Sequence, residues 1–155
     1  MKAVLTHKIV RDFEGIPAEK VFDAVQSLGG DNGWFRYDRL WQIRGFVDKL
    51  LGGPGLNRGR RDPIDLRIGD DLDFWRVVDI RDGKRLLLLA QMRLPGKTWL
   101  DFSVEKECLI QTSYFLPNGL WGRIYWSLIK PFHGLIFADI ARGIVKKAGI
   151  LKNIP

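Results

Sequence analysis

The sequence has little of what metal sites and disulfide scaffolds require: one cysteine, Cys108, and two histidines, His7 and His133. A single cysteine excludes an internal disulfide framework and a cysteine-based metal site. Two histidines far apart in the chain do not supply a histidine-based site either. We therefore predict no metal and no cofactor. This sparing use of cysteine is typical of a reducing cytoplasm, which is the expected location.

The chain also lacks a long uninterrupted apolar segment. Residues 1–15 contain no apolar run long enough for a signal peptide. The most apolar part, residues 120–145, carries five ionisable side chains: Arg123, Lys130, His133, Asp139 and Arg142. A helix that crosses a bilayer needs about 20 largely uncharged residues, so no transmembrane helix is predicted. Peripheral contact with a membrane surface stays open, because the segment is amphipathic and basic.

What the sequence does have is a globular composition rich in aromatic residues. The 155 residues are 46% apolar and 28% charged, with six Trp and nine Phe, which predicts one domain over residues 1–155 with a proper core. The aromatic content favours a wide interior or a ligand cavity. The net charge of +7 allows an anionic partner, but the basic residues are scattered, so nucleic acid is not the expected one.

Residues 119–149 predict one long amphipathic helix. Two rows of apolar residues recur at every fourth position, and polar residues gather on the other side: Arg123, Ser127, Lys130, Arg142 and Lys146. His133 interrupts the second apolar row. Pro131 lacks a backbone N–H and predicts a kink near residues 129–130. We expect the half before the kink to line a cavity and the half after it to anchor the helix.

The segments before this helix predict two short helices and a meander of strands. A change of the apolar period to two after Gly69, with turns at Asp82–Gly83 and Pro95–Gly96, is typical of antiparallel hairpins. The second helix would carry Leu40, Ile43, Val47, Leu50 and Leu51 on one face. The expected order is a strand (3–14), a helix after Pro17, a helix after Asp38, an arginine-rich loop (56–67), strands between 71 and 116, and the long helix.

This order predicts an α+β fold in which a curved antiparallel β-sheet wraps around a long C-terminal α-helix, with two short helices after the first strand. The long helix can cover only one face of the sheet. A gap is expected wherever large side chains from the sheet and the helix do not meet, and such a gap is the natural ligand site.

Several stretches resemble one family of domains. They are Trp41 with Arg44 and Gly45, GGPGLNRGRR (52–61), GDDLDFWRV (69–77), MRLPGKTWLDF (92–102) and QTSYFLPNGLWGRIYWSLIKPFHGLIF (111–137). On these stretches the chain resembles the DUF2867 family of the START-like (Bet v 1-like, polyketide cyclase) superfamily. The resemblance implies the helix-grip fold and an apolar cavity. It carries over no chemistry, because the family has no settled activity. Relatives are often fused behind a nicotinamide-dependent dehydrogenase-like domain, which implies a possible protein partner of that kind.

The candidate wall of the cavity combines aromatic side chains with a few polar ones: Trp41, Arg44, Asp73, Trp75, Arg76, Met92, Trp99, Asp101, Tyr114, Tyr125 and His133. Arg44 or Arg76 would anchor a polar group of the ligand. The aspartates also fit a solvated outer face of the sheet. His133 fits either a structural role at the kink or an acid–base role. The Gly-rich loop 52–59 fits a helix stop and a lid, and it lacks the strand-before, helix-after context of a dinucleotide fingerprint.

Two functions follow from these residues. The first is a module that binds an apolar or amphipathic small molecule between the sheet and the long helix. The second is an enzyme that uses the same cavity, with Asp73 or Asp101 as the base and a tyrosine as the proton donor. A third possibility is an accessory domain that docks on a dehydrogenase-like protein or on a membrane surface.

Overall fold

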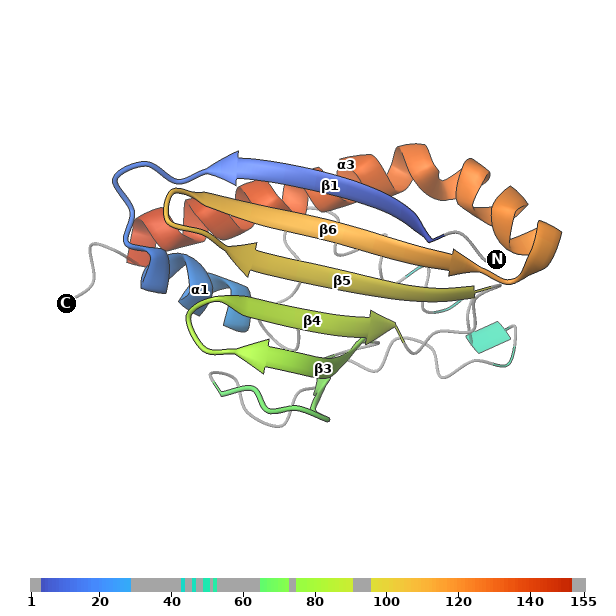
Figure 1. The fold of residues 1–155 in the computed structure, drawn as a ribbon, viewed down its shortest axis with the longest axis horizontal. Coiled ribbons are helices and arrows are strands. Elements are labelled where there is room, and N and C mark those ends of the chain that lie inside the picture. Colours follow the sequence, from blue (N-terminus) through green and yellow to red (C-terminus); the bar gives the residue numbers. More distant parts are fainter. Residues whose placement is uncertain are drawn as a thin grey trace.

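The computed structural model describes residues 4–28, 43, 46, 49–50, 52, 65–72, 75–90 and 96–151. Its core is a six-stranded antiparallel curved sheet in the order β1-β6-β5-β4-β3-β2. The strands are β1 (Leu5–Asp12), β2 (Asp71–Leu72), β3 (Trp75–Arg81), β4 (Arg85–Ala90), β5 (Gly96–Val104) and β6 (Cys108–Pro117). Two helices, α1 (Ala18–Gln26) and α3 (Gly119–Leu151), lie on one face of the sheet (Figure 1).

The face that α1 and α3 cover is called the inner face below, and the opposite one the outer face. On β6 the inner face carries Gln111 and Phe115, since both contact α3. Because side chains alternate along a strand, Thr112 and Tyr114 lie on the outer face. The register extends both faces across β5, β4 and β1.

A β-bulge explains the mixed pattern that the sequence of β3 shows. The register between β3 and β4 shifts between Val77 and Asp79, so the strand has one extra residue at that point. Trp75 and Val77 are fully buried before the bulge. After it, Ile80 pairs with the buried Leu86 and packs against the core. A strict alternation of buried and exposed residues therefore cannot describe β3.

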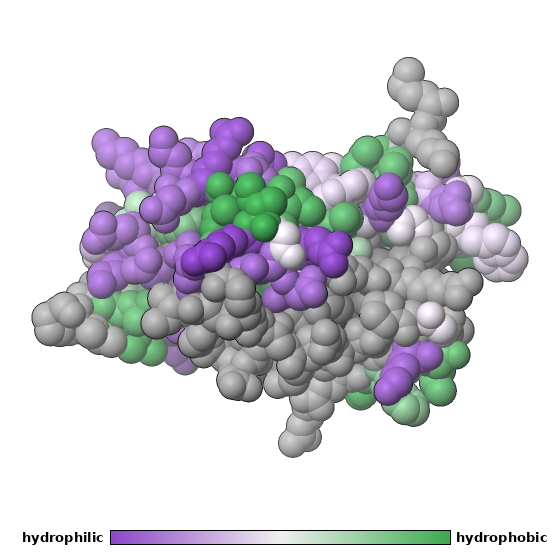
Figure 2. Space-filling view, turned by 90° about the horizontal axis from the view of Figure 1, so that it is seen from below, coloured by the Kyte–Doolittle hydropathy of each residue, from purple (hydrophilic) through white to green (hydrophobic). Residues whose placement is uncertain are grey.

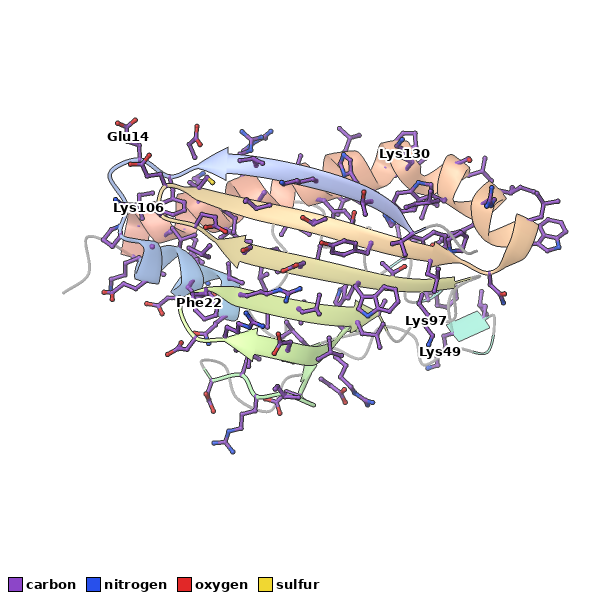
Figure 3. The ribbon with its side chains drawn as sticks, in the orientation of Figure 1. Glu14, Phe22, Lys49, Lys97, Lys106 and Lys130 are labelled. Carbon is purple, nitrogen blue, oxygen red and sulfur yellow. The ribbon has the colours of Figure 1, made fainter. Side chains whose placement is uncertain are left out.

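The main hydrophobic core lies between the sheet, α1 and the C-terminal half of α3. Phe22 of α1 (Figure 3) and Ile140 of α3 are both at most 1% exposed and belong to one buried cluster with Leu88, Leu100 and Phe102 of the sheet. Each such side chain stabilises the fold by about 1.5–3 kcal/mol relative to its exposed state. The second half of the long helix therefore anchors it to the sheet, as the sequence predicts.

The every-fourth-residue rows of α3 do not form one continuous face. At 3.6 residues per turn such a row drifts by about 40° at each step. The row that starts at Leu120 is accordingly 72% exposed at Leu120 and 63% exposed at Phe132, but fully buried at Ile140 and Ile144. The buried line instead runs through Gly122, Trp126, Phe137, Ile140, Ala141, Ile144 and Ala148.

The helix α3 continues through Pro131 without a break. Its ribbon nevertheless changes direction in the first half (Figure 1), and Lys130, next to the proline, lies at this bend (Figure 3). A proline inside a helix removes a backbone hydrogen bond and is a common cause of such bends. The bend lies where the sequence predicts a kink.

The second predicted helix is described only in part. Residues 43, 46, 49 and 50 are helical, and the rest of that segment lies outside the described residues. Ile43 and Leu50, both expected on its apolar face, are 60% and 71% exposed.

Candidate functional site

The inner face of the sheet becomes polar under the middle of α3, where Gln111 contacts Phe137. Three polar side chains from β5 and β6 are almost completely buried there: Thr98, Gln111 and Ser113 are 5%, 1% and 2% exposed. Buried polar groups cost free energy unless they are hydrogen-bonded. This part of the interior is therefore built differently from the apolar core beside it.

Gln111 holds the centre of this polar region. Its Nε2 atom donates a hydrogen bond to the backbone carbonyl of Phe137 on α3, at 3.1 Å. Its Oε1 atom is buried and accepts no hydrogen bond from any residue that the structure describes. An unsatisfied buried acceptor costs about 1–3 kcal/mol, and a ligand with a donor group would remove that cost.

A chain of aromatic side chains borders the polar region. Phe115 stacks on Trp126 with ring centroids 5.3 Å apart, and Trp126 meets the edge of His133 at 5.8 Å. His133 in turn lies 4.9 Å from the ring of Phe137. Tyr125 also contacts Phe115, at 5.9 Å. These rings separate the main core from the end of the molecule at which α3 begins.

A groove with a volume of about 360 Å³ opens beside this cluster, between α3 and the ends of β1 and β6. Its lining combines apolar and basic residues: Leu5, Pro117, Arg123, Trp126, Ser127 and Lys130. The volume lies within the range of small-molecule sites. Trp126 belongs to both the groove and the aromatic cluster, so its side chain lies between the groove and the buried polar residues, none of which lines the groove.

Four of the predicted wall residues lie on the outer face instead. Arg76, Trp99 and Tyr114 form one row across β3, β5 and β6, in which Leu89 pairs with both Arg76 and Trp99. Asp101 lies in the next row, paired with Leu87. None of these four side chains faces α3. The prediction put them on the cavity side because each strand carries apolar residues on both faces, so hydropathy does not tell the two faces apart.

The outer-face residues have structural partners. Arg85 donates from Nε and Nη2 to the carboxylate of Asp101, at 3.0–3.2 Å, and Asp101 is only 8% exposed. This hydrogen bond raises the pKa of Arg85. Arg76 lies 3.4 Å from the carboxylate of Asp71 and is largely exposed. Neither Arg76 nor Asp101 is available to a ligand between the sheet and α3.

The remaining predicted residues divide into two groups. Trp75, Tyr125 and His133 lie on the inner side: Trp75 is fully buried in the main core, and the other two line the aromatic cluster. Four further candidates, and most of the Gly- and Arg-rich loop, lie outside the described residues: Trp41, Arg44, Asp73 and Met92.

Sequence reasoning indicates that Gln111 can present a polar group to an apolar space but leaves it out of the candidate wall, and it misses Ser113, Arg123 and Lys130. The signal for the first two was present, since polar residues two apart on an otherwise apolar strand place two polar groups on one face. Arg123, Ser127 and Lys130 follow helical spacing beside Trp126, but were assigned to the solvent side.

Within the described parts of the chain, no group of three or more His, Cys, Asp or Glu side chains is arranged to hold a metal ion. None of the helices in those parts is long and apolar enough to cross a bilayer.

The class of protein follows from this architecture. A curved six-stranded antiparallel sheet around a long C-terminal helix is the helix-grip fold. Residues 2–140 match the model of the family DUF2867, described as a protein of unknown function. The chain belongs to this family.

Solved structures share the fold at low sequence identity. An uncharacterized protein from Rhizobium leguminosarum matches with a TM-score of 0.54 at 13% identity, covering 97% of both chains. Norcoclaurine synthase from Thalictrum flavum matches with a TM-score of 0.53 at 9% identity, covering 94% of this chain and 86% of the enzyme. These likenesses concern the fold alone. No curated protein matches the sequence.

Proposed function

We propose that the protein binds an amphipathic small molecule between the inner face of the sheet and the part of α3 from Arg123 to Phe137. The observation that carries this proposal is the buried Oε1 atom of Gln111, which has no hydrogen-bond donor among the described residues. A bound molecule with a hydroxyl or amide donor would supply the missing hydrogen bond.

The groove indicates the chemistry of the ligand. Leu5, Pro117 and Trp126 offer an apolar surface, and Arg123 and Lys130 place two positive charges beside it. In the described part of the chain, no ion pair involves either of these two basic side chains. An apolar body with a carboxylate or sulfonate group fits such a lining, because charge-assisted hydrogen bonds to Arg and Lys are strong.

A displacement titration tests this proposal. The probe is 1-anilinonaphthalene-8-sulfonate, which combines an apolar ring system with an anion, and oleate is the competitor. We expect saturable one-to-one binding of the probe and its displacement by oleate. The double variant Arg123→Gln/Lys130→Gln should weaken binding by at least about tenfold, since a hydrogen bond to a charged group contributes about 1.5–3 kcal/mol.

The matched control is Arg142→Gln, which removes an exposed basic residue of the same helix away from the groove. Its affinity should equal that of the wild type. Equal weakening in the control and the double variant would mean that the probe responds only to net charge. That result, or an absence of saturable binding, would contradict the proposal.

The alternative of an enzyme in the same space has less support. Its proposed base Asp101 is held by Arg85 on the outer face, and Asp73 lies outside the described residues. No comparison supports a dehydrogenase-like partner. Binding without a reaction is therefore the function that we favour.

A further inference from the structure

The first half of α3 carries a second apolar face, directed away from the sheet. Six large side chains form this outer stripe, each between 42% and 77% exposed: Leu120, Trp121, Ile124, Leu128, Phe132 and Leu135. At about 100° per residue the six fall within an arc of about 120°. The buried line through Trp126 and Phe137 lies on the opposite side of the helix. Exposure of these apolar side chains to water is unfavourable. Large contiguous apolar patches are accordingly uncommon on soluble monomers.

The stripe is confined to one end of the molecule. Beyond Leu135 the same side of α3 carries Asp139, Arg142 and Lys146, so the helix has an ordinary polar surface there. Ile43, Phe46 and Leu50 are also 60–71% exposed, and Lys49 beside them lies toward the end at which α3 begins (Figure 3). Hydrophobic side chains come to the surface at this end, on the right-hand side of Figure 2.

The acidic and basic side chains in the first half of α3 are all of one sign. Arg123 and Lys130 are exposed on the same half of the helix, and residues 119–138 contain no Asp or Glu. If a second copy of the chain covered the stripe, two like-charged segments would face each other without an acidic partner, which opposes association. An anionic surface provides the complementary charge.

We propose that the outer stripe docks on a membrane surface that contains anionic lipid headgroups. Leu, Phe and Trp on one side of a helix with Arg and Lys beside them is the pattern of helices that lie in the bilayer interface. The six side chains offer on the order of 800 Å² of accessible surface, as much as one partner contributes to a standard protein interface. Arg123 and Lys130 also line the proposed ligand groove, so the two proposals are separated by Leu128 and Phe132, which belong to the stripe and do not line the groove.

Co-sedimentation with vesicles tests the docking. Vesicles of phosphatidylcholine with phosphatidylserine are compared with vesicles of phosphatidylcholine alone. We expect the wild-type protein to bind the first kind more tightly, and the difference to vanish as ionic strength rises from about 0.1 M to about 1 M, since screening shortens the Debye length to about 3 Å. Arg123→Gln/Lys130→Gln should lose about 25-fold in partitioning, at about fivefold for each charge.

The decisive variant is Leu128→Gln/Phe132→Gln, because both side chains belong to the stripe and neither lines the groove. We expect its partitioning to fall by at least tenfold for each apolar side chain that the bilayer no longer buries. Both residues are more than 60% exposed, so folding should not change. Ile150→Gln is the matched control: Ile150 is 60% exposed on the same helix but lies far from the stripe. It should bind as the wild type does.

Three results would overturn the docking proposal. The first is no binding to either kind of vesicle. The second is equal loss in Leu128→Gln/Phe132→Gln and in Ile150→Gln. The third is a dimer in sedimentation equilibrium without lipid that Leu128→Gln/Phe132→Gln abolishes, since the stripe would then be a contact between two copies. Probe binding by this variant is measured in parallel, and retained probe binding separates a failure of docking from a failure of ligand binding.

Discussion

Replacing Gln111 with leucine should separate stability from binding. The glutamine is 1% exposed, donates one hydrogen bond to Phe137 and leaves its Oε1 atom unsatisfied among the described residues. Leucine has nearly the same size and removes both polar atoms. Loss of the hydrogen bond costs about 0.5–1.5 kcal/mol, and removal of the buried unsatisfied acceptor recovers about 1–3 kcal/mol. The carbonyl of Phe137 remains inside a continuous helix.

We therefore expect Gln111→Leu to raise the free energy of unfolding by about 1 kcal/mol, or the melting temperature by about 2–4 °C for a chain of this size. Urea denaturation with an unchanged m-value would measure the shift. Affinity for 1-anilinonaphthalene-8-sulfonate, which carries an N–H donor, should fall by about two- to tenfold, because the hydrogen bond to Oε1, worth about 0.5–1.5 kcal/mol, is lost. A loss of more than about 1 kcal/mol in stability would refute the reasoning, because Gln111 would then be a fully satisfied structural residue.

Two further substitutions test the geometry around the site. Gly96→Ala should destabilise the fold by about 2–3 kcal/mol, because Gly96 has a φ of 154° and a Cβ atom would collide with the carbonyl oxygen of Leu116. Gly134→Ala is its control of opposite sign: the new methyl would meet only His7, at 3.8 Å, and alanine should stabilise the helix by about 0.5–1 kcal/mol in thermal unfolding. Arg85→Gln should cost about 1.5–3 kcal/mol, since it leaves the carboxylate of Asp101 largely buried without its partner. Because the pKa of Arg85 is raised, this contribution should be constant at neutral pH and disappear only in strong alkali; an earlier loss on the alkaline side would contradict the assignment.

The sequence was sufficient to predict the fold class. The helical spacing of Val21, Phe22 and Val25 and the turn at Asp82–Gly83 are local signals, and each decides an element without knowledge of the rest of the chain. The long helix was predicted over residues 119–149 and extends over Gly119–Leu151. These elements in this order leave few arrangements that bury their apolar faces.

The sequence does not indicate which face of the sheet each strand residue occupies. Tyr114 and Ser113 differ little as indicators of burial, and Leu87 and Leu89 on the outer face are as apolar as Leu86 and Leu88 on the inner one. Only the pairing partner of each residue decides which face it occupies. The bulge after Val77 adds a further change of phase that no periodic pattern contains.

The helix α3 shows a second limit of pattern analysis. Its first half is apolar on two opposite sides, so the hydropathy of Trp121 and of Trp126 is the same, yet one is 77% exposed and the other 7% exposed. The prediction treats the residues at every fourth position as one face, although this row passes from one side of the helix to the other. Tertiary contacts with Phe115 decide which of the two tryptophans is buried.

The central claim is that a ligand binds between the inner face of the sheet and the part of α3 from Arg123 to Phe137, and an NMR titration tests it most directly. The probe 1-anilinonaphthalene-8-sulfonate is added to ¹⁵N-labelled protein while the indole N–H signals of Trp126, Trp121 and Trp99 and the side-chain amide of Gln111 are observed. Trp126 is on the inner side, Trp121 in the outer stripe and Trp99 on the outer face of the sheet. We expect saturable shifts for Trp126 and Gln111 with no change at Trp99. Shifts confined to Trp121 or Trp99, or no saturable shift at all, would contradict the claim.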